Sequence, residues 1–128
     1  RAGMRRVRCG FSIEEAHAAA LRVLDRRDRP TAIFALSDTV ACGVYAACRD
    51  RGMRVPDDLS VVGFDDIPVA PLLDPPLTVV GWDTPHAAEA AVEMLTEAID
   101  GRPAAETVLG PQLVTRGSTA PPSRVPVG

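Results

Sequence analysis

The sequence contains no lysine and no asparagine, and aromatic residues make up only 4% of it. Its 14 basic residues are therefore all arginine, which, together with abundant proline, indicates the coding bias of a GC-rich genome. The net charge is −3 at pH 7, and one basic cluster lies at the start, at Arg1, Arg5, Arg6 and Arg8. Because a protein grips DNA phosphates with a basic face, we expect this chain not to bind nucleic acid itself.

Cysteine is also scarce, and its three copies follow no metal-binding pattern. Cys9, Cys42 and Cys48 cannot all pair with one another, and no CxxC or Cys/His spacing indicates a zinc site. Buried free thiols in a reducing cytoplasm are the default interpretation. No apolar run approaches the roughly 18 residues of a transmembrane helix, and no signal peptide opens the chain. Because the chain starts abruptly without Met, we expect a fragment of a longer protein.

Apolar runs of strand length alternate with amphipathic stretches of helix length. Ser12 and Glu15 form a capping box that starts the first helix, and Gly52 is placed to end the second. Thr84 is expected to cap the third, with Pro85 in its first turn. The expected strands are 4–9, TAIFAL at 31–36, LSVVGF at 59–64, 77–80 and 112–115, and the expected helices are 13–24, 38–51 and 84–100.

The runs TAIFAL and LSVVGF are apolar without alternation, which is typical of strands buried on both faces of a parallel sheet. Strands alternating with helices predict an α/β fold, and right-handed crossovers limit it to a doubly wound parallel sheet. The Pro-rich segment from Ala120 to Gly128 is expected to be a disordered tail.

The residues directly after the strands lie where a ligand of such a sheet would bind, at the carboxyl ends of the strands. They are Gly10-Phe11, Ser37-Asp38, Asp65-Asp66 and Gly81-Trp82, and Trp82 is the only tryptophan. An aromatic ring can stack on the apolar face of a sugar, while hydroxyls and carboxylates bind its OH groups. No Gly-rich loop or lysine is present to hold an anion. This edge therefore predicts a small neutral polyol as ligand, with no metal and no cofactor.

Each of these residues also has a purely structural interpretation. Phe11 could staple onto the helix that follows it, and Trp82 could pack at a subdomain boundary. Ser37 or Asp38 could cap the next helix, and for Asp38 this is the stronger interpretation. Their shared position at one edge is what favours a binding role.

Asp65 and Asp66 could likewise only shape a turn, and for Asp66 this is the stronger interpretation. The two resemble paired catalytic carboxylates, but consecutive residues after a strand point in different directions. His17 and His86 lie on expected helices with no nucleophile nearby, and no GxSxG, HExxH or P-loop motif is present. We therefore expect the chain not to be an enzyme.

Together these segments resemble the C-terminal part of the effector domain of LacI/GalR transcriptional regulators, over nearly all of residues 9–122. The matching features are Ser37-Asp38 after a strand, the turn from Arg54 to Asp58, Gly63-Phe64-Asp65-Asp66 after the next strand, Pro75 to Thr78 and the closing segment VTRGSTAPP. The resemblance implies a type I periplasmic-binding-protein-like fold, in which two Rossmann-like subdomains enclose a cleft.

The resemblance also implies how the chain divides. Residues 1–81 would form most of the C-terminal subdomain, 82–105 a helix crossing toward the N-terminal subdomain, and 106–119 a returning strand, followed by the tail 120–128. The helix 38–51 and the loop 67–73 would form surfaces of a homodimer. The helix-turn-helix that binds operator DNA would lie outside these residues.

By similarity, Phe11 matches the aromatic residue that stacks on the effector, and Asp65 matches the main hydroxyl-binding carboxylate. Ser37 stands where the family often has a ligand-binding Asn, and Trp82 lies in the crossover that lines the cleft. The implied function is a cytoplasmic, sugar-responsive repressor whose ligand favours the closed cleft and changes operator affinity. A sugar-binding protein of a transport system is the alternative, and the GFDDIP and STAPP segments favour the repressor.

Overall fold

The structure, a computed structural model, describes residues 3–103 and 106–122. Its elements are α1 (Ile13–Leu24), β1 (Ala32–Phe34), α2 (Asp38–Asp50), β2 (Ser60–Asp65), the 3-10 turn η1 (Ala70–Leu72), β3 (Thr78–Gly81), α3 (Thr84–Ile99) and β4 (Gln112–Val114). The expected alternation of helices and strands is therefore confirmed from Ile13 onward. No helix in these two stretches is long and apolar enough to cross a membrane.

The strands form one sheet in the order β1-β2-β3-β4. The first three run parallel, with Phe34 opposite Val62 and Asp65 opposite Gly81. β4 runs antiparallel to β3, with Gln112 opposite Gly81. The reason is that the chain leaves the body of the molecule, which is the sheet with α1 and α2, at the end of β3 and returns to it after α3. The parallel arrangement is thus confirmed for β1 to β3, and β4 makes the sheet mixed.

The expected strand at 4–9 is wrong, since this segment forms no regular element. It contains three arginines, and Val7 is 54% exposed, so the segment has no apolar face to bury. Arg5 instead lies with its Nη2 atom 2.8 Å from Oδ2 of Asp28. Arg1 of the basic cluster lies outside the described residues.

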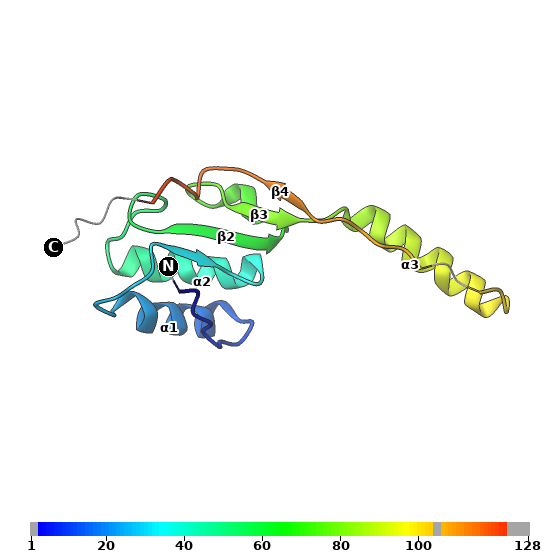
Figure 1. The fold of residues 1–128 in the computed structure, drawn as a ribbon, viewed down its shortest axis with the longest axis horizontal. Coiled ribbons are helices and arrows are strands. Elements are labelled where there is room, and N and C mark those ends of the chain that lie inside the picture. The colour runs from blue at the N-terminus through cyan, green and yellow to red at the C-terminus, as the bar shows by residue number, and fades with distance from the viewer. Residues whose placement is uncertain (1–2, 104–105, 123–128) are drawn as a thin grey trace.

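The core lies between the sheet and α2, which covers one side of the sheet, and it continues into the contact between α2 and α1 (Figure 1). Its largest fully buried aliphatic side chains are Leu59, Val61, Leu77 and Val79. On the other face, Phe34 is 54% exposed, and Leu36, just beyond β1, is 70% exposed. The expectation that TAIFAL is buried on both faces is therefore wrong. The reason is that α1 packs beside α2 instead of covering the opposite face.

Local signals in the sequence fix the ends of α1 and α2. The capping box is confirmed, because the Glu15 amide donates to Ser12 Oγ at 3.1 Å and the Ser12 amide donates to the Glu15 carboxylate at 3.4 Å. Gly52 follows α2 with a φ of 61°, the left-handed conformation expected at a helix end. The two helices meet at Gly43, where a Cβ atom would lie 2.6 Å from that of Ala16.

Helix α3 extends away from the body, and the following segment returns beside it toward β4 (Figure 1). Asp83 caps α3 by accepting a hydrogen bond from the His86 amide at 3.0 Å. The expected cap, Thr84, is instead the first helical residue, because the Asp83 carboxylate already bonds the first turn. No residue of α3 is buried, and its apolar stripe is exposed at Val92, Leu95 and Ile99.

The segment after β4 runs back across the body. Ser118 is buried, donates to the Val61 carbonyl at 2.6 Å and accepts from the Thr78 amide at 2.7 Å. Ala120 exchanges hydrogen bonds of 3.1 and 3.3 Å with the Ser60 hydroxyl. The start of the expected tail is thus bonded to the sheet, while 123–128 and the crossover residues 104–105 lie outside the described residues.

The cysteines are free thiols at three depths: Cys9 is exposed, Cys42 is half-buried and Cys48 is buried. Burial raises the pKa of the Cys48 thiol to about 11 and also raises the pKa of Cys42. The expectation of buried thiols is therefore correct for Cys48 and wrong for Cys9. Across 3–103 and 106–122, no cluster of His, Cys, Asp or Glu side chains could hold a metal ion.

Candidate ligand-binding site

The carboxyl ends of β1, β2 and β3 meet at one edge of the sheet, and the turn before α1 lies at the same end (Figure 1). Asp65 ends β2 directly opposite Gly81, so that Trp82 continues from the neighbouring strand. Trp82 is 42% exposed and Phe11 is 77% exposed. Both aromatic rings that the sequence singles out are thus accessible from this end.

Ser37, and not Asp38, caps α2. The Ser37 hydroxyl accepts a hydrogen bond from the Val40 amide at 3.2 Å. Asp38 is fully buried, and its Oδ2 accepts from the Ile67 amide at 2.8 Å. Burial raises the pKa of the Asp38 carboxyl, while the bond from Ile67 opposes this effect. The interpretation of Asp38 as a cap is therefore wrong, because its carboxylate bonds the loop after β2.

Asp66 does more than shape a turn, because it is paired with Arg116. The Arg116 Nη2 atom donates to Oδ2 of Asp66 at 3.0 Å and lies 2.7 Å from Oδ1. Arg116 also donates from Nη1 to the Leu77 carbonyl and from its amide to Thr78 Oγ1, both at 2.9 Å. The pair spans 50 positions of sequence, so no local pattern could have indicated it.

Asp65 directly precedes the two anchored residues Asp66 and Ile67, and its carboxylate differs from those of Asp38 and Asp66. Its φ is 103° and that of Asp66 is 62°, in a region that residues other than glycine rarely adopt. The Asp65 carboxylate is half-buried and makes no hydrogen bond or ion pair with any residue that the structure describes. A carboxylate can accept several hydrogen bonds, so this group keeps its acceptor capacity for the hydroxyls of a ligand.

A hollow of about 270 Å³ opens beside this edge, where the chain crosses toward α3. It is lined by Asp66, Gly81, Trp82, Asp83, Gln112 and Val114. Of the four predicted site residues, Trp82 is the one that borders it. Sequence reasoning missed Gln112, which reaches the hollow because β4 pairs with β3 there. The two crossing segments thus add polar groups to the edge.

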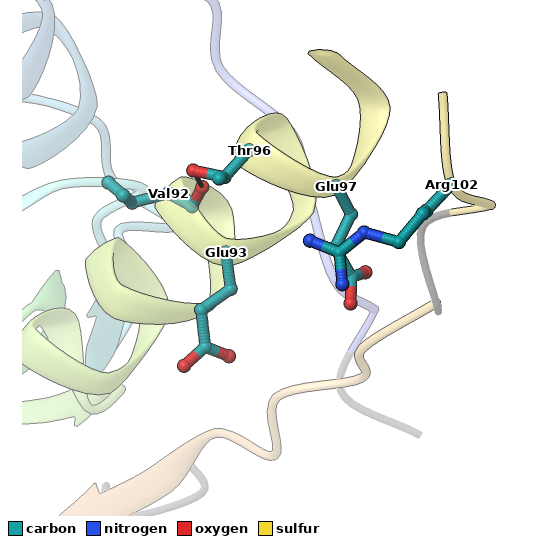
Figure 2. Close-up of a pocket in the computed structure, with 5 residues that line it drawn as sticks. All are labelled: Val92, Glu93, Thr96, Glu97 and Arg102. Atoms are coloured by element: carbon teal, nitrogen blue, oxygen red, sulfur yellow. Dashed lines mark hydrogen bonds between the residues drawn. The ribbon is translucent and has the colours of Figure 1, made fainter. Parts of the chain in front are cut away.

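A second hollow, of about 260 Å³, lies along α3 and is lined by Val92, Glu93, Thr96, Glu97 and Arg102 (Figure 2). Thr96 Oγ1 already donates to the Val92 carbonyl at 2.8 Å, and Arg102 donates to Asp100 at 3.0 Å. Figure 2 shows Glu93 directed away from Arg102, so these side chains do not converge on one ligand position. This hollow is therefore not a candidate site.

Comparison with known proteins agrees with this architecture. A family model described as a periplasmic binding protein-like domain matches residues 2–119. The HTH-type transcriptional regulator MalR of Streptomyces coelicolor is 46% identical over 112 residues, which cover 86% of this chain and 32% of MalR. The regulator DegA of Bacillus subtilis is 41% identical over 113 residues, or 87% of this chain and 33% of DegA. The chain thus spans about a third of the length of these relatives.

Solved structures share the fold. A LacI family transcriptional regulator from Arthrobacter sp. FB24, in complex with lactose, matches with a TM-score of 0.81 and 34% identity, over 89% of this chain and 44% of the regulator. A LacI family regulator from Enterococcus faecium with bound ribose matches with a TM-score of 0.83 and 26% identity, over 92% of this chain and 44% of the regulator.

The fold is that of an effector domain, an α/β sheet with polar groups gathered at its strand ends. The chain belongs to the periplasmic binding protein-like domain family, and it corresponds to the C-terminal part of the effector domain of LacI family transcriptional regulators. The resemblance stated from the residues is therefore confirmed. Its relatives are regulators of transcription and not enzymes.

Proposed function

We propose that this chain is the effector-binding part of a sugar-responsive repressor, with Phe11, Ser37, Asp65 and Trp82 at the ligand. The observation that carries the proposal is the Asp65 carboxylate, which ends β2 beside Trp82 and has no partner among the described residues. Structural neighbours with bound lactose and ribose support a sugar as the ligand class. Relatives that are transcription regulators support a repressor over a transport protein.

The chemistry of the edge suits a neutral polyol. Asp65 can accept two hydroxyl hydrogen bonds, and the exposed rings of Phe11 and Trp82 can stack on the apolar face of a sugar. The Ser37 hydroxyl accepts from α2 but keeps its own proton to donate. A phosphate is disfavoured, because Arg116 is already paired with Asp66.

The whole regulator would act in the cytoplasm as a homodimer on operator DNA. Residues 1–81 would form the C-terminal subdomain, and 82–105 and 106–119 would cross to the N-terminal subdomain, which the exposed apolar stripe of α3 supports. The ligand would favour the closed cleft by binding both subdomains, and the dimer would carry the shift to the DNA-binding heads. Helix α2 and the loop 67–73, where Leu72 is 79% exposed, are the proposed dimer surfaces.

The test is Asp65→Ala in the full-length regulator, with sugar binding measured by calorimetry over a panel that includes lactose and ribose. Loss of a charged hydrogen bond costs about 1.5–3 kcal/mol, so the affinity for the bound sugar should fall by at least about tenfold. Asp57→Ala, which removes an exposed carboxylate in the turn before β2, is the matched control and should leave the sugar affinity unchanged. An affinity of the Asp65 variant within about threefold of the unmodified protein would refute the assignment.

A further inference from the structure

The turn after β2 adopts a conformation that its own residues do not favour. Asp65 and Asp66 both have positive φ, at 103° and 62°. Such a conformation is unfavourable for a residue with a side chain and persists only where the surroundings hold it. The contacts that hold the residues next to Asp65 therefore decide where its carboxylate lies.

The first contact comes from α2. Asp38 is fully buried, and its Oδ2 accepts from the Ile67 amide at 2.8 Å, which fixes the backbone two residues beyond Asp65. The other oxygen lies against Gly63, where a Cβ atom would overlap Oδ1. Only a glycine in β2 leaves room for the Asp38 carboxylate at this depth.

The second contact comes from the segment after β4. Arg116 reaches Oδ2 of Asp66 at 3.0 Å and Oδ1 at 2.7 Å, with side chains only 20% and 28% exposed. Arg116 is itself fixed at the start of β3, where its side chain bonds the Leu77 carbonyl and its amide bonds Thr78 Oγ1, both at 2.9 Å. Gly81 completes the fit, because a Cβ atom there would lie 3.0 Å from that of Asp66.

We propose that Asp38 and the Asp66–Arg116 pair are positioning residues, which hold the turn from α2 and from the segment after β4 so that the Asp65 carboxylate stays free at the ligand edge. Of the three carboxylates at the strand ends, those of Asp38 and Asp66 bond other groups of the protein, and that of Asp65 remains for the ligand. This inference rests on the proposed role of Asp65 in sugar binding. It assigns Arg116, on the segment that returns from α3, to the geometry of that same site.

The test is a double-mutant cycle for sugar affinity in the full-length regulator, with calorimetry on the sugar that the panel above identifies. Asp66→Asn keeps the shape and an acceptor but loses the charge that holds Arg116. We expect it to lower affinity about tenfold alone and by less than about threefold in an Asp65→Asn background, because it acts through Asp65. A residue that only stabilised the fold would show the same loss in both backgrounds.

Arg116→Met and Arg116→Lys extend the cycle. Methionine should reproduce the loss seen with Asp66→Asn, and lysine should restore part of the affinity, because it keeps the charge but not the second side-chain donor, which bonds the Leu77 carbonyl. Arg51→Met is the matched control, since it breaks an Arg–Asp pair of 2.6 and 2.7 Å to Asp25, between the C-terminal ends of α1 and α2. It should leave sugar affinity unchanged.

The outcomes separate this inference from the function on which it rests. If Asp65→Ala lowers affinity but Asp66→Asn stays within threefold, or acts equally in both backgrounds, the positioning role is wrong and the ligand site stands. If Asp65→Ala itself has no effect, both are wrong. Thermal unfolding of each variant identifies any that fails to fold, and Asp66→Asn, the mildest change, then decides the question.

Discussion

Tyr45 shows how one hydroxyl joins two distant segments of the chain. It is the only tyrosine, and its hydroxyl donates to the Pro75 carbonyl at 2.8 Å, which ties α2 to the turn before β3. Burial raises the pKa of the phenol to about 12, because the charged phenolate would lose its hydration there. The folded protein therefore favours the neutral phenol over the phenolate.

The contribution of Tyr45 to the free energy of unfolding should therefore fall at high pH. A phenol whose pKa is raised on folding stabilises the native state fully below its unfolded value of 10.0, and the contribution is lost as the pH rises toward about 12. Ultraviolet titration of the phenolate, as the difference between the protein and Tyr45→Phe, should show a midpoint well above that of the same protein in denaturant. Equal midpoints would mean that the hydroxyl is solvated.

For single residues, the sequence indicates which side chains lie together at the strand ends, but not the group to which each of them is hydrogen-bonded. Asp38, Asp65 and Asp66 are all predictable as polar groups at strand ends, because a continuous apolar run of strand length is a local signal. The roles of Asp38 and Asp66 depend on partners 29 and 50 positions away, at Ile67 and Arg116. Such pairings form only once the chain is folded, so the local sequence predicts a cap at Asp38 and a turn residue at Asp66.

Between elements, α1 and α2 approach each other closely at Gly43. A Cβ atom there would lie 2.6 Å from both the Ala16 Cβ and the Ile13 carbonyl oxygen, and 2.7 Å from the His17 amide. Glycine costs a helix about 1 kcal/mol relative to alanine. The close packing that it permits must outweigh this cost, because the two helices form much of the core.

Gly43→Ala should therefore destabilise the protein although alanine is the better helix former. Overpacking costs about 1–3 kcal/mol, which exceeds the propensity gain of about 1 kcal/mol, and the contacts here include backbone that cannot move aside. Denaturant unfolding of the variant gives the sign directly. Ala46→Gly in the same helix isolates the propensity term, and stabilisation by Gly43→Ala would show that the helices can separate without cost.

Elements with local signals are predictable here, and those without are not. The capping box at Ser12 and Glu15 marks α1 because both partners lie within one turn. The segment 4–9 carries no such signal, and its apolar residues found no partner strand. The direction of β4 depends on the path of the chain through α3, which no pattern within Gln112–Val114 encodes.

For the whole molecule, the contrast between body and α3 is the main feature. Leu59 in the body is completely buried, whereas Leu95 of α3 is 62% exposed. Apolar burial supplies most of the stabilisation of a fold. The stability of these residues as a unit should therefore come from the body, with α3 adding little.

The same substitution in the two places tests this. Leu59→Ala should lower the free energy of unfolding of residues 1–128 by about 2–5 kcal/mol, because it leaves a cavity in the core. Leu95→Ala should change it by no more than about 0.5 kcal/mol, as is usual for exposed positions. Chemical denaturation measures both. A large effect of Leu95→Ala would show that α3 packs on something in solution, and repeating it in the full-length regulator would show whether the N-terminal subdomain supplies that contact.

The uncovered face of the sheet has a consequence for handling the protein. β1 pairs with β2 on one side, its other edge is open among the described residues, and Phe34 and Leu36 stand exposed beside it. An open strand edge next to apolar side chains is the geometry by which one chain adds to another in aggregates. Residues 1–128 produced without further polypeptide should therefore be soluble only at low concentration, and a charged residue in place of Phe34 is the simplest way to raise that limit.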